Sequence, residues 1–68
     1  MPWTIETELE DDGRWLAEVM ELPGVMAYGR DKAEAIERVQ VLCLRVIAER
    51  IENGEDVPDV DNVFAVTP

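Results

Sequence analysis

The chain of 68 residues holds 16 acidic and 6 basic side chains and no histidine, which gives a net charge of −10. This balance argues against direct nucleic-acid binding, in which Lys and Arg replace condensed counterions, and against binding to anionic membrane surfaces. It suits either plain solubility or a basic protein partner, and electrostatics alone does not distinguish these two.

The small size of the chain limits its hydrophobic core. A domain of this length buries only about 60% of its unfolded surface, and disulfides, metals or oligomerisation commonly reinforce such domains. A single cysteine excludes an internal disulfide, and without histidine it argues against a zinc or other soft-metal site. Because 47% of the residues are hydrophobic, we expect a homo-oligomer, either a dimer or a tetramer.

The N-terminus lacks the basic and apolar regions of a signal peptide, and no apolar run approaches the roughly 20 residues that span a bilayer. Together with the free cysteine, these features predict a cytoplasmic protein that does not act at membranes. We expect one domain over residues 1–68, with no C-terminal DNA-binding domain.

Residues 3–10 and 14–20 alternate with a period of two, which predicts the two strands of a hairpin. An Asp-Gly pair at 12–13 lies between them and is typical of a hairpin turn. The side chains expected to face the core are Trp3, Ile5, Leu9, Trp15, Ala17 and Val19.

The other face of this hairpin is the candidate binding surface. It combines carboxylates with two apolar side chains, and its members are Glu6, Glu8, Glu10, Leu16, Glu18 and Met20. The two apolar residues are either covered by another molecule or ordinary exposed surface. All six share a face only if the Asp12-Gly13 turn has the expected register, because a slip of one residue reverses the faces of a strand.

Pro23-Gly24 interrupts the alternation and predicts a type II turn. A third short strand is expected over residues 25–28, and Gly29 after it is expected to permit a sharp path into the next element. A last short strand is expected over residues 62–66. The predicted fold is therefore α+β with the order β-β-β-α-β, in which one helix packs on one face of a three-stranded antiparallel sheet.

Residues 31–53 predict that helix, which at roughly six turns is long for so small a protein. Asp31 is placed as the N-cap, and Glu34 three residues later completes the pattern of a capping box. Asn53 and Gly54 form the expected C-terminal stop.

Apolar residues at helical spacing predict the face of the helix that packs on the sheet, namely Ala35, Ile36, Val39, Leu42, Cys43 and Val46. Leu44, Ile47 and Ile51 widen this face on one flank. We expect that flank to contact another subunit of the oligomer.

The polar residues argue against an enzyme. No histidine is available as a general base, and Cys43 lies on the apolar face, where burial raises the pKa of a thiol and makes it inert. Clustered carboxylates can bind Mg²⁺, but a cluster on one strand is more typical of a solvated or partner-binding face. We predict no catalytic residue, no metal site and no cofactor.

An ordered series of motifs covers most of the chain: DGRWLAEV at 12–19, ELPGV at 21–25, YGRDKAEAI at 28–36 and GEDVP at 54–58. In this order and spacing, the series resembles the HicB-like antitoxin family. The residues that carry the match also have structural roles in turns, caps and close packing, and they are Pro23, Gly24, Gly29, Asp31, Glu34 and Ala35. The resemblance therefore bears on fold more firmly than on function.

The resemblance implies a partial RNase H-like fold and a non-enzymatic antitoxin that binds a HicA-type toxin, a small basic mRNA interferase. Many members also carry a C-terminal DNA-binding segment, so autorepression by this chain would need another protein. The expected mechanism is competition, in which the acidic hairpin face covers the RNA-binding surface or active site of the toxin. The alternative is an oligomeric interaction or regulatory module without a toxin. A Mg²⁺-dependent nuclease is the least favoured hypothesis.

Overall fold

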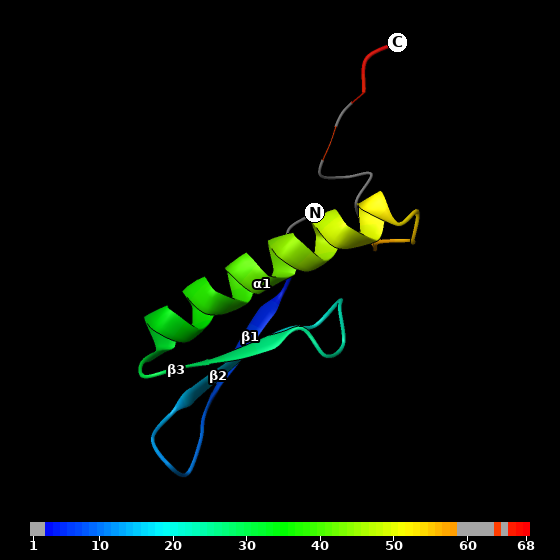
Figure 1. The fold of residues 1–68 in the computed structure, drawn as a ribbon. Coiled ribbons are helices and arrows are strands. Elements are labelled where there is room, and N and C mark those ends of the chain that lie inside the picture. The colour runs from blue at the N-terminus through cyan, green and yellow to red at the C-terminus, as the bar shows by residue number, and fades with distance from the viewer. Residues whose placement is uncertain (1–2, 59–63, 65) are drawn as a thin grey trace.

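The structure is a computed structural model that describes residues 3–58, 64 and 66–68. Three strands, β1 (Ile5–Leu9), β2 (Trp15–Val19) and β3 (Met26–Gly29), precede one helix, α1 (Lys32–Glu52). The strands form an antiparallel sheet in the order β1-β2-β3, and α1 lies across one face of it (Figure 1). The predicted α+β class is confirmed, and each element begins and ends within two residues of the predicted bounds.

The last strand predicted over residues 62–66 falls mostly outside the described residues. Of its members, the structure describes Phe64 and Val66, and both are exposed and outside regular secondary structure. The order of elements in the described part of the chain is therefore β-β-β-α.

The hairpin between β1 and β2 has the register that the sequence predicts. The Glu10 N–H donates to the Arg14 carbonyl at 2.8 Å, and the Gly13 N–H donates to the Glu10 carbonyl at 3.0 Å. Gly13 has a φ of 89°, so the loop is a three-residue connection with its glycine in the left-handed position. Leu9 consequently lies opposite Trp15, and Thr7 lies opposite Ala17. The prediction that Leu9 packs in the core is wrong, because its side chain is 56% exposed.

The predicted type II turn is also present after β2. The Val25 N–H donates to the Leu22 carbonyl at 3.0 Å, and Gly24 between them has a φ of 91°, which glycine adopts without strain. Leu22 and Val25 are both buried. The turn is therefore anchored in the core at both of its ends.

Gly29 has a different role from the one predicted for it. It is the last residue of β3, pairs with Trp15, and is buried. A Cβ at this position would lie 2.9 Å from the Cα of Ala35 and 2.9 Å from the carbonyl carbon of Glu34. Glycine is needed here for space, because the first turn of α1 rests directly against the end of β3.

The N-terminus of α1 is capped largely as predicted. The Asp31 carboxylate accepts a hydrogen bond from the Glu34 N–H at 2.8 Å, as an N-cap side chain does. The Glu34 carboxylate reaches one residue further back than in a standard capping box and accepts from the Arg30 N–H at 2.9 Å. The helix start is thus joined to the end of β3.

The C-terminus of α1 ends in a Schellman motif. Gly54 has a φ of 72°, and its N–H donates to the Ile51 carbonyl at 3.1 Å. The Glu55 N–H donates to the Arg50 carbonyl at 2.8 Å. This pair of bonds satisfies two of the carbonyls that a helix end leaves unpaired, so the predicted stop is confirmed.

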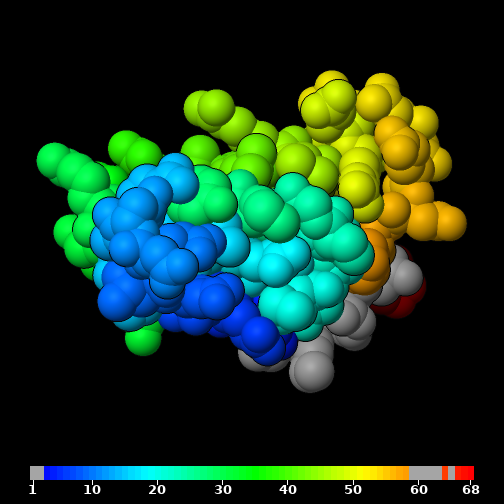
Figure 2. Space-filling view, turned by 90° about the horizontal axis from the view of Figure 1, so that it is seen from below, coloured from blue at the N-terminus to red at the C-terminus, as the bar shows by residue number. Residues whose placement is uncertain are grey.

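The core lies between the sheet and α1. Its buried members come from the strands, the turn after β2 and one stripe of the helix: Ala17, Val19, Leu22, Val25, Ala35, Val39 and Cys43. Burial raises the pKa of the Cys43 thiol, which fits the packing role predicted for it. In the space-filling view, the strands and their turns face the viewer while α1 runs along one border (Figure 2). Within the described part of the chain, no helix combines the length and apolar character that crossing a membrane requires.

Candidate functional site

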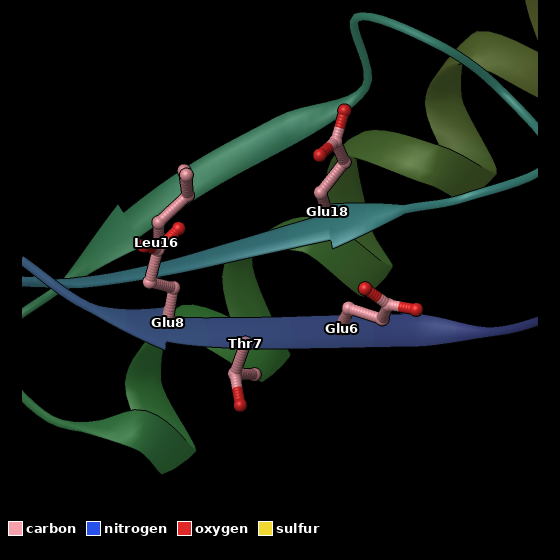
Figure 3. A pocket seen from close by; sticks show the side chains of 5 residues that line it. All are labelled: Glu6, Thr7, Glu8, Leu16 and Glu18. Carbon is pink, nitrogen blue, oxygen red and sulfur yellow. The ribbon is translucent and has the colours of Figure 1, made fainter.

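The sheet face that points away from α1 is the candidate site, and we call it the open face. The register places two rows of side chains there: Glu6, Glu18 and Met26 in one row, and Glu8, Leu16 and Tyr28 in the other. Directly paired residues in an antiparallel sheet project to the same side, so each row is a line of neighbours across three strands. Figure 3 shows Glu6, Glu8, Leu16 and Glu18 on this side of the sheet, with α1 behind it.

The open face contains a shallow depression of about 280 Å³ between β1 and β2. It is lined by the side chains of Glu6, Glu8, Leu16 and Glu18, with Thr7 at its border. Thr7 points away from the other four (Figure 3), because odd-numbered residues of β1 face α1. The depression therefore has an apolar side chain and three carboxylates around it.

The carboxylates of Glu6 and Glu18 project from directly opposite positions on β1 and β2. Like charges at such positions destabilise an antiparallel pair, so this arrangement costs the free protein stability. A cation that binds between the two carboxylates would remove the repulsion. In chemical terms, the open face is suited to a Lys or Arg side chain of a partner.

Arg14 lies at the end of this face nearest the hairpin turn, and two neighbours hold it. Its guanidinium carbon lies 4.1 Å from the centre of the Tyr28 ring, and its Nε donates to Asp12 Oδ2 at 2.7 Å. The Arg14 backbone N–H also donates to Asp12, and these bonds lower the pKa of that carboxyl group. Since Asp12 and Tyr28 both contact this guanidinium, it does not extend over Glu6 and Glu18.

No family model, curated protein or solved structure matches this chain. The assignment of a function therefore depends on the residues and their geometry.

The structure brings together most of the residues predicted for partner binding. Glu6, Glu8, Leu16 and Glu18 are adjacent on the open face, as the predicted register requires. Glu10 lies just past the end of β1, beside the hairpin loop, and Met20 lies just past the end of β2. These two therefore mark opposite ends of the face.

Sequence reasoning missed the contribution of β3 to this face. Met26 and Tyr28 are exposed and pair with Glu18 and Leu16 respectively. The alternation along this strand could have predicted them. Val25 and Ala27 face the core, and the residues that alternate with them in a strand must face the other way. Their addition makes the open face half apolar.

Of the three residues predicted to contact another subunit, two are exposed and one is half-buried. Leu44 and Ile51 are 67% and 48% exposed. Ile47 is half-buried and packs against the core, so it belongs to the sheet-facing side of α1. Val41, which was not predicted, is 47% exposed on the outer side.

Carboxylate groups also join separate segments near the borders of the fold. Glu21 accepts a hydrogen bond from the Thr4 N–H at 2.8 Å, and this bond lowers the pKa of Glu21. Among the described residues, no three His, Cys, Asp or Glu side chains are grouped as metal ligands. In the described part of the chain, the carboxylates that make hydrogen bonds accept them from backbone N–H groups and arginine side chains.

Proposed function

We propose that this protein is a non-enzymatic HicB-like antitoxin that binds and neutralises a basic HicA-type mRNA interferase through its open face. The observation that carries the proposal is the directly opposed pair Glu6 and Glu18, set beside the half-buried Leu16 of β2 and the exposed Met26 and Tyr28 of β3. Among the described residues these two carboxylates have no ion pair. Two such carboxylates next to apolar surface favour a partner that presents Lys or Arg from an apolar surrounding.

The binding mode that we propose has two components. A basic side chain of the toxin lies between Glu6 and Glu18, where it replaces a repulsion with two attractions. Leu16, Met26 and Tyr28 exclude water around this contact, which strengthens the charge interaction. Because a toxin that cleaves RNA needs its basic residues to hold phosphates, covering them prevents RNA from binding.

The net charge of −10 supports the same proposal at longer range. Opposite net charges accelerate the encounter of two proteins, and they orient the acidic side of one toward the basic side of the other.

The alternative is an oligomeric interaction or regulatory module without a toxin. One observation favours it, namely the exposure of Leu44 and Ile51 on α1. The reading frame next to this one distinguishes the two functions, because a small basic protein with a single candidate catalytic histidine would favour the antitoxin.

The direct experiment measures binding between this chain and that neighbouring toxin by calorimetry. The double variant Glu6→Lys/Glu18→Lys is expected to raise the Kd by on the order of 100-fold or more, because both attractions become repulsions. In this double variant the two positions still carry like charges, so the repulsion between them within the hairpin remains. A matched control, Glu49→Lys/Asp56→Lys, changes the net charge equally at exposed positions away from the open face. Equal loss in both variants, or no loss in the first, would remove the open face from the mechanism.

A further inference from the structure

The outer side of α1 carries a second line of apolar residues, which we call the outer stripe. It consists of Val41, Leu44, Ala48 and Ile51, all of which are exposed. Their spacing of three, four and three residues keeps them in one line along the helix, on the side away from Ala35, Val39 and Cys43, which pack on the sheet. This alternation of three and four is the spacing through which two helices pack side by side.

The charges of the chain are distributed unevenly between α1 and the rest. Residues 32–52 contain four basic side chains, Lys32, Arg38, Arg45 and Arg50, and four acidic ones, Glu34, Glu37, Glu49 and Glu52. The helix is therefore neutral, and the whole net charge of −10 belongs to the strands, the connections and the C-terminal segment. Two copies of this protein repel each other least when they approach helix to helix.

The same distribution excludes the proposed toxin as the favoured occupant of the outer stripe. A basic partner is attracted to the acidic open face, and a neutral apolar line offers it no electrostatic advantage. A second copy of this chain matches the outer stripe in both respects, since it presents an equally neutral and equally apolar surface.

We infer that the outer stripe is a homodimer interface in which two α1 helices pack antiparallel about a two-fold axis. When the axis passes close to residue 46, Leu44 packs on Ala48 of the second copy and Val41 packs on its Ile51. The small Ala48 side chain allows the two helices to approach closely. Both open faces stay accessible, because they lie on the other side of each sheet from α1.

The helix dipoles favour the antiparallel direction over the parallel one, because the dipoles of antiparallel helices attract each other and those of parallel helices repel. The two Arg45 side chains lie near the axis and are long enough to extend their charged ends into solvent.

The oligomeric state tests the interface without any toxin. Sedimentation of the full chain at micromolar concentrations is expected to give twice the 7.7 kDa mass of one chain. Leu44→Glu is expected to raise the dissociation constant of the dimer about 30-fold or more, because it places a charge at the centre of the contact. The matched control Leu9→Glu changes an exposed leucine outside the helix and is expected to leave the dimer intact. Circular dichroism confirms that both variants fold.

A monomeric wild-type chain, or a dimer that Leu44→Glu leaves unchanged, would overturn the interface. Cross-linking then tests the direction of the helices. In the antiparallel arrangement, two copies of residue 41 are about 15 Å apart along the axis, too far for a disulfide. Val41→Cys and Ile51→Cys are each expected to stay uncross-linked alone under mild oxidation and to cross-link when mixed. The wild-type chain, with Cys43 buried, is the control. Cross-linking of either variant alone would overturn the antiparallel pairing.

Discussion

At Gly29, the absence of a side chain determines how closely the helix approaches the sheet. The backbone of Ala35 occupies the space that a Cβ would need. Gly24 is also a turn-forming residue, but its requirement is conformational, because its φ is 91° and no atom lies within 4 Å of its added Cβ. The two glycines therefore serve different physical purposes.

This difference predicts opposite responses to asparagine, which tolerates positive φ but is larger than alanine. Gly24→Ala is expected to cost about 1–2 kcal/mol of stability, and Gly24→Asn less. Gly29→Ala is expected to cost about 1–3 kcal/mol through overpacking, and Gly29→Asn more. Urea denaturation measures all four variants. If the Ala variant is the more stable one at both positions, or the Asn variant is the more stable one at both, the distinction between the two glycines is wrong.

Glu34 connects three segments of the protein at the start of α1. Its carboxylate accepts from the Arg30 side chain at 3.0 Å and lies 3.6 Å from Arg38, which in turn donates to the Tyr28 carbonyl at 3.2 Å. The Arg30 side-chain bond, followed by its backbone N–H, holds the pKa of Glu34 below the ordinary value of 4.5. The ionised form is therefore the one that stabilises the fold.

Because the pKa of Glu34 is lower in the folded than in the unfolded state, its contribution is fully present above the unfolded pKa. It is lost as the pH falls through the folded pKa, below 4.5. Glu34→Gln is therefore expected to be less stable than wild type at neutral pH, with a difference that shrinks in acid. Urea denaturation across this pH range measures the difference. Glu37→Gln, an exposed change on the same helix, is the control, and a difference for Glu34→Gln that does not vary with pH would refute the linkage.

At the scale of elements, the sheet faces two environments. Its α1 side holds buried residues such as Ala17 and Val19, and its open face holds the opposed carboxylates of Glu6 and Glu18. The open face thus carries an electrostatic cost that packing on the other side must offset. Such a cost is typical of surfaces that serve binding rather than stability.

The single variant Glu18→Lys is expected to change stability and binding in opposite directions. It places a cation opposite Glu6 and should stabilise the free protein by about 0.2–1 kcal/mol. It should also weaken toxin binding, because the proposed binding position for a basic side chain between the two carboxylates is lost. Thermal denaturation and calorimetry measure the two effects. Glu8→Lys, which faces Leu16, is the control and should give a smaller gain in stability.

At the scale of the whole molecule, the neutral helix lies on one side of the sheet and the acidic open face on the other. The two proposed contacts therefore differ in their dependence on salt. Association through the open face relies on charge, whereas pairing through the outer stripe relies on apolar contact.

Raising the ionic strength from low to physiological is expected to slow association with the toxin by about 10-fold or more, as for other electrostatically steered pairs. The mass of the dimer is expected to stay constant over the same range. Stopped-flow mixing measures the first quantity and sedimentation the second. An association rate that is insensitive to salt would contradict steering by the net charge.

The partner-binding face could be predicted because two local features of the sequence define it. A period of two separates Glu6 and Glu8 from Ile5 and Thr7, and the Asp12-Gly13 turn sets the register of β1 with β2. The helix caps at Asp31 and Gly54 are equally local. Features of this kind are predictable because the groups that interact lie within a few residues of one another along the chain.

The sequence by itself therefore determined the order of the three strands and the helix that follows them, the turns, the caps and which residues share each hairpin face. Only the tertiary structure decided that Ile47 packs on the core while Leu44 stays exposed, because the width of helix that a sheet covers depends on how the two cross. It also decided that β3 pairs with β2, which adds Met26 and Tyr28 to the open face, and that Gly29 makes room for Ala35. These outcomes depend on how the elements pair and pack against one another, which the periodicity of a single element does not specify.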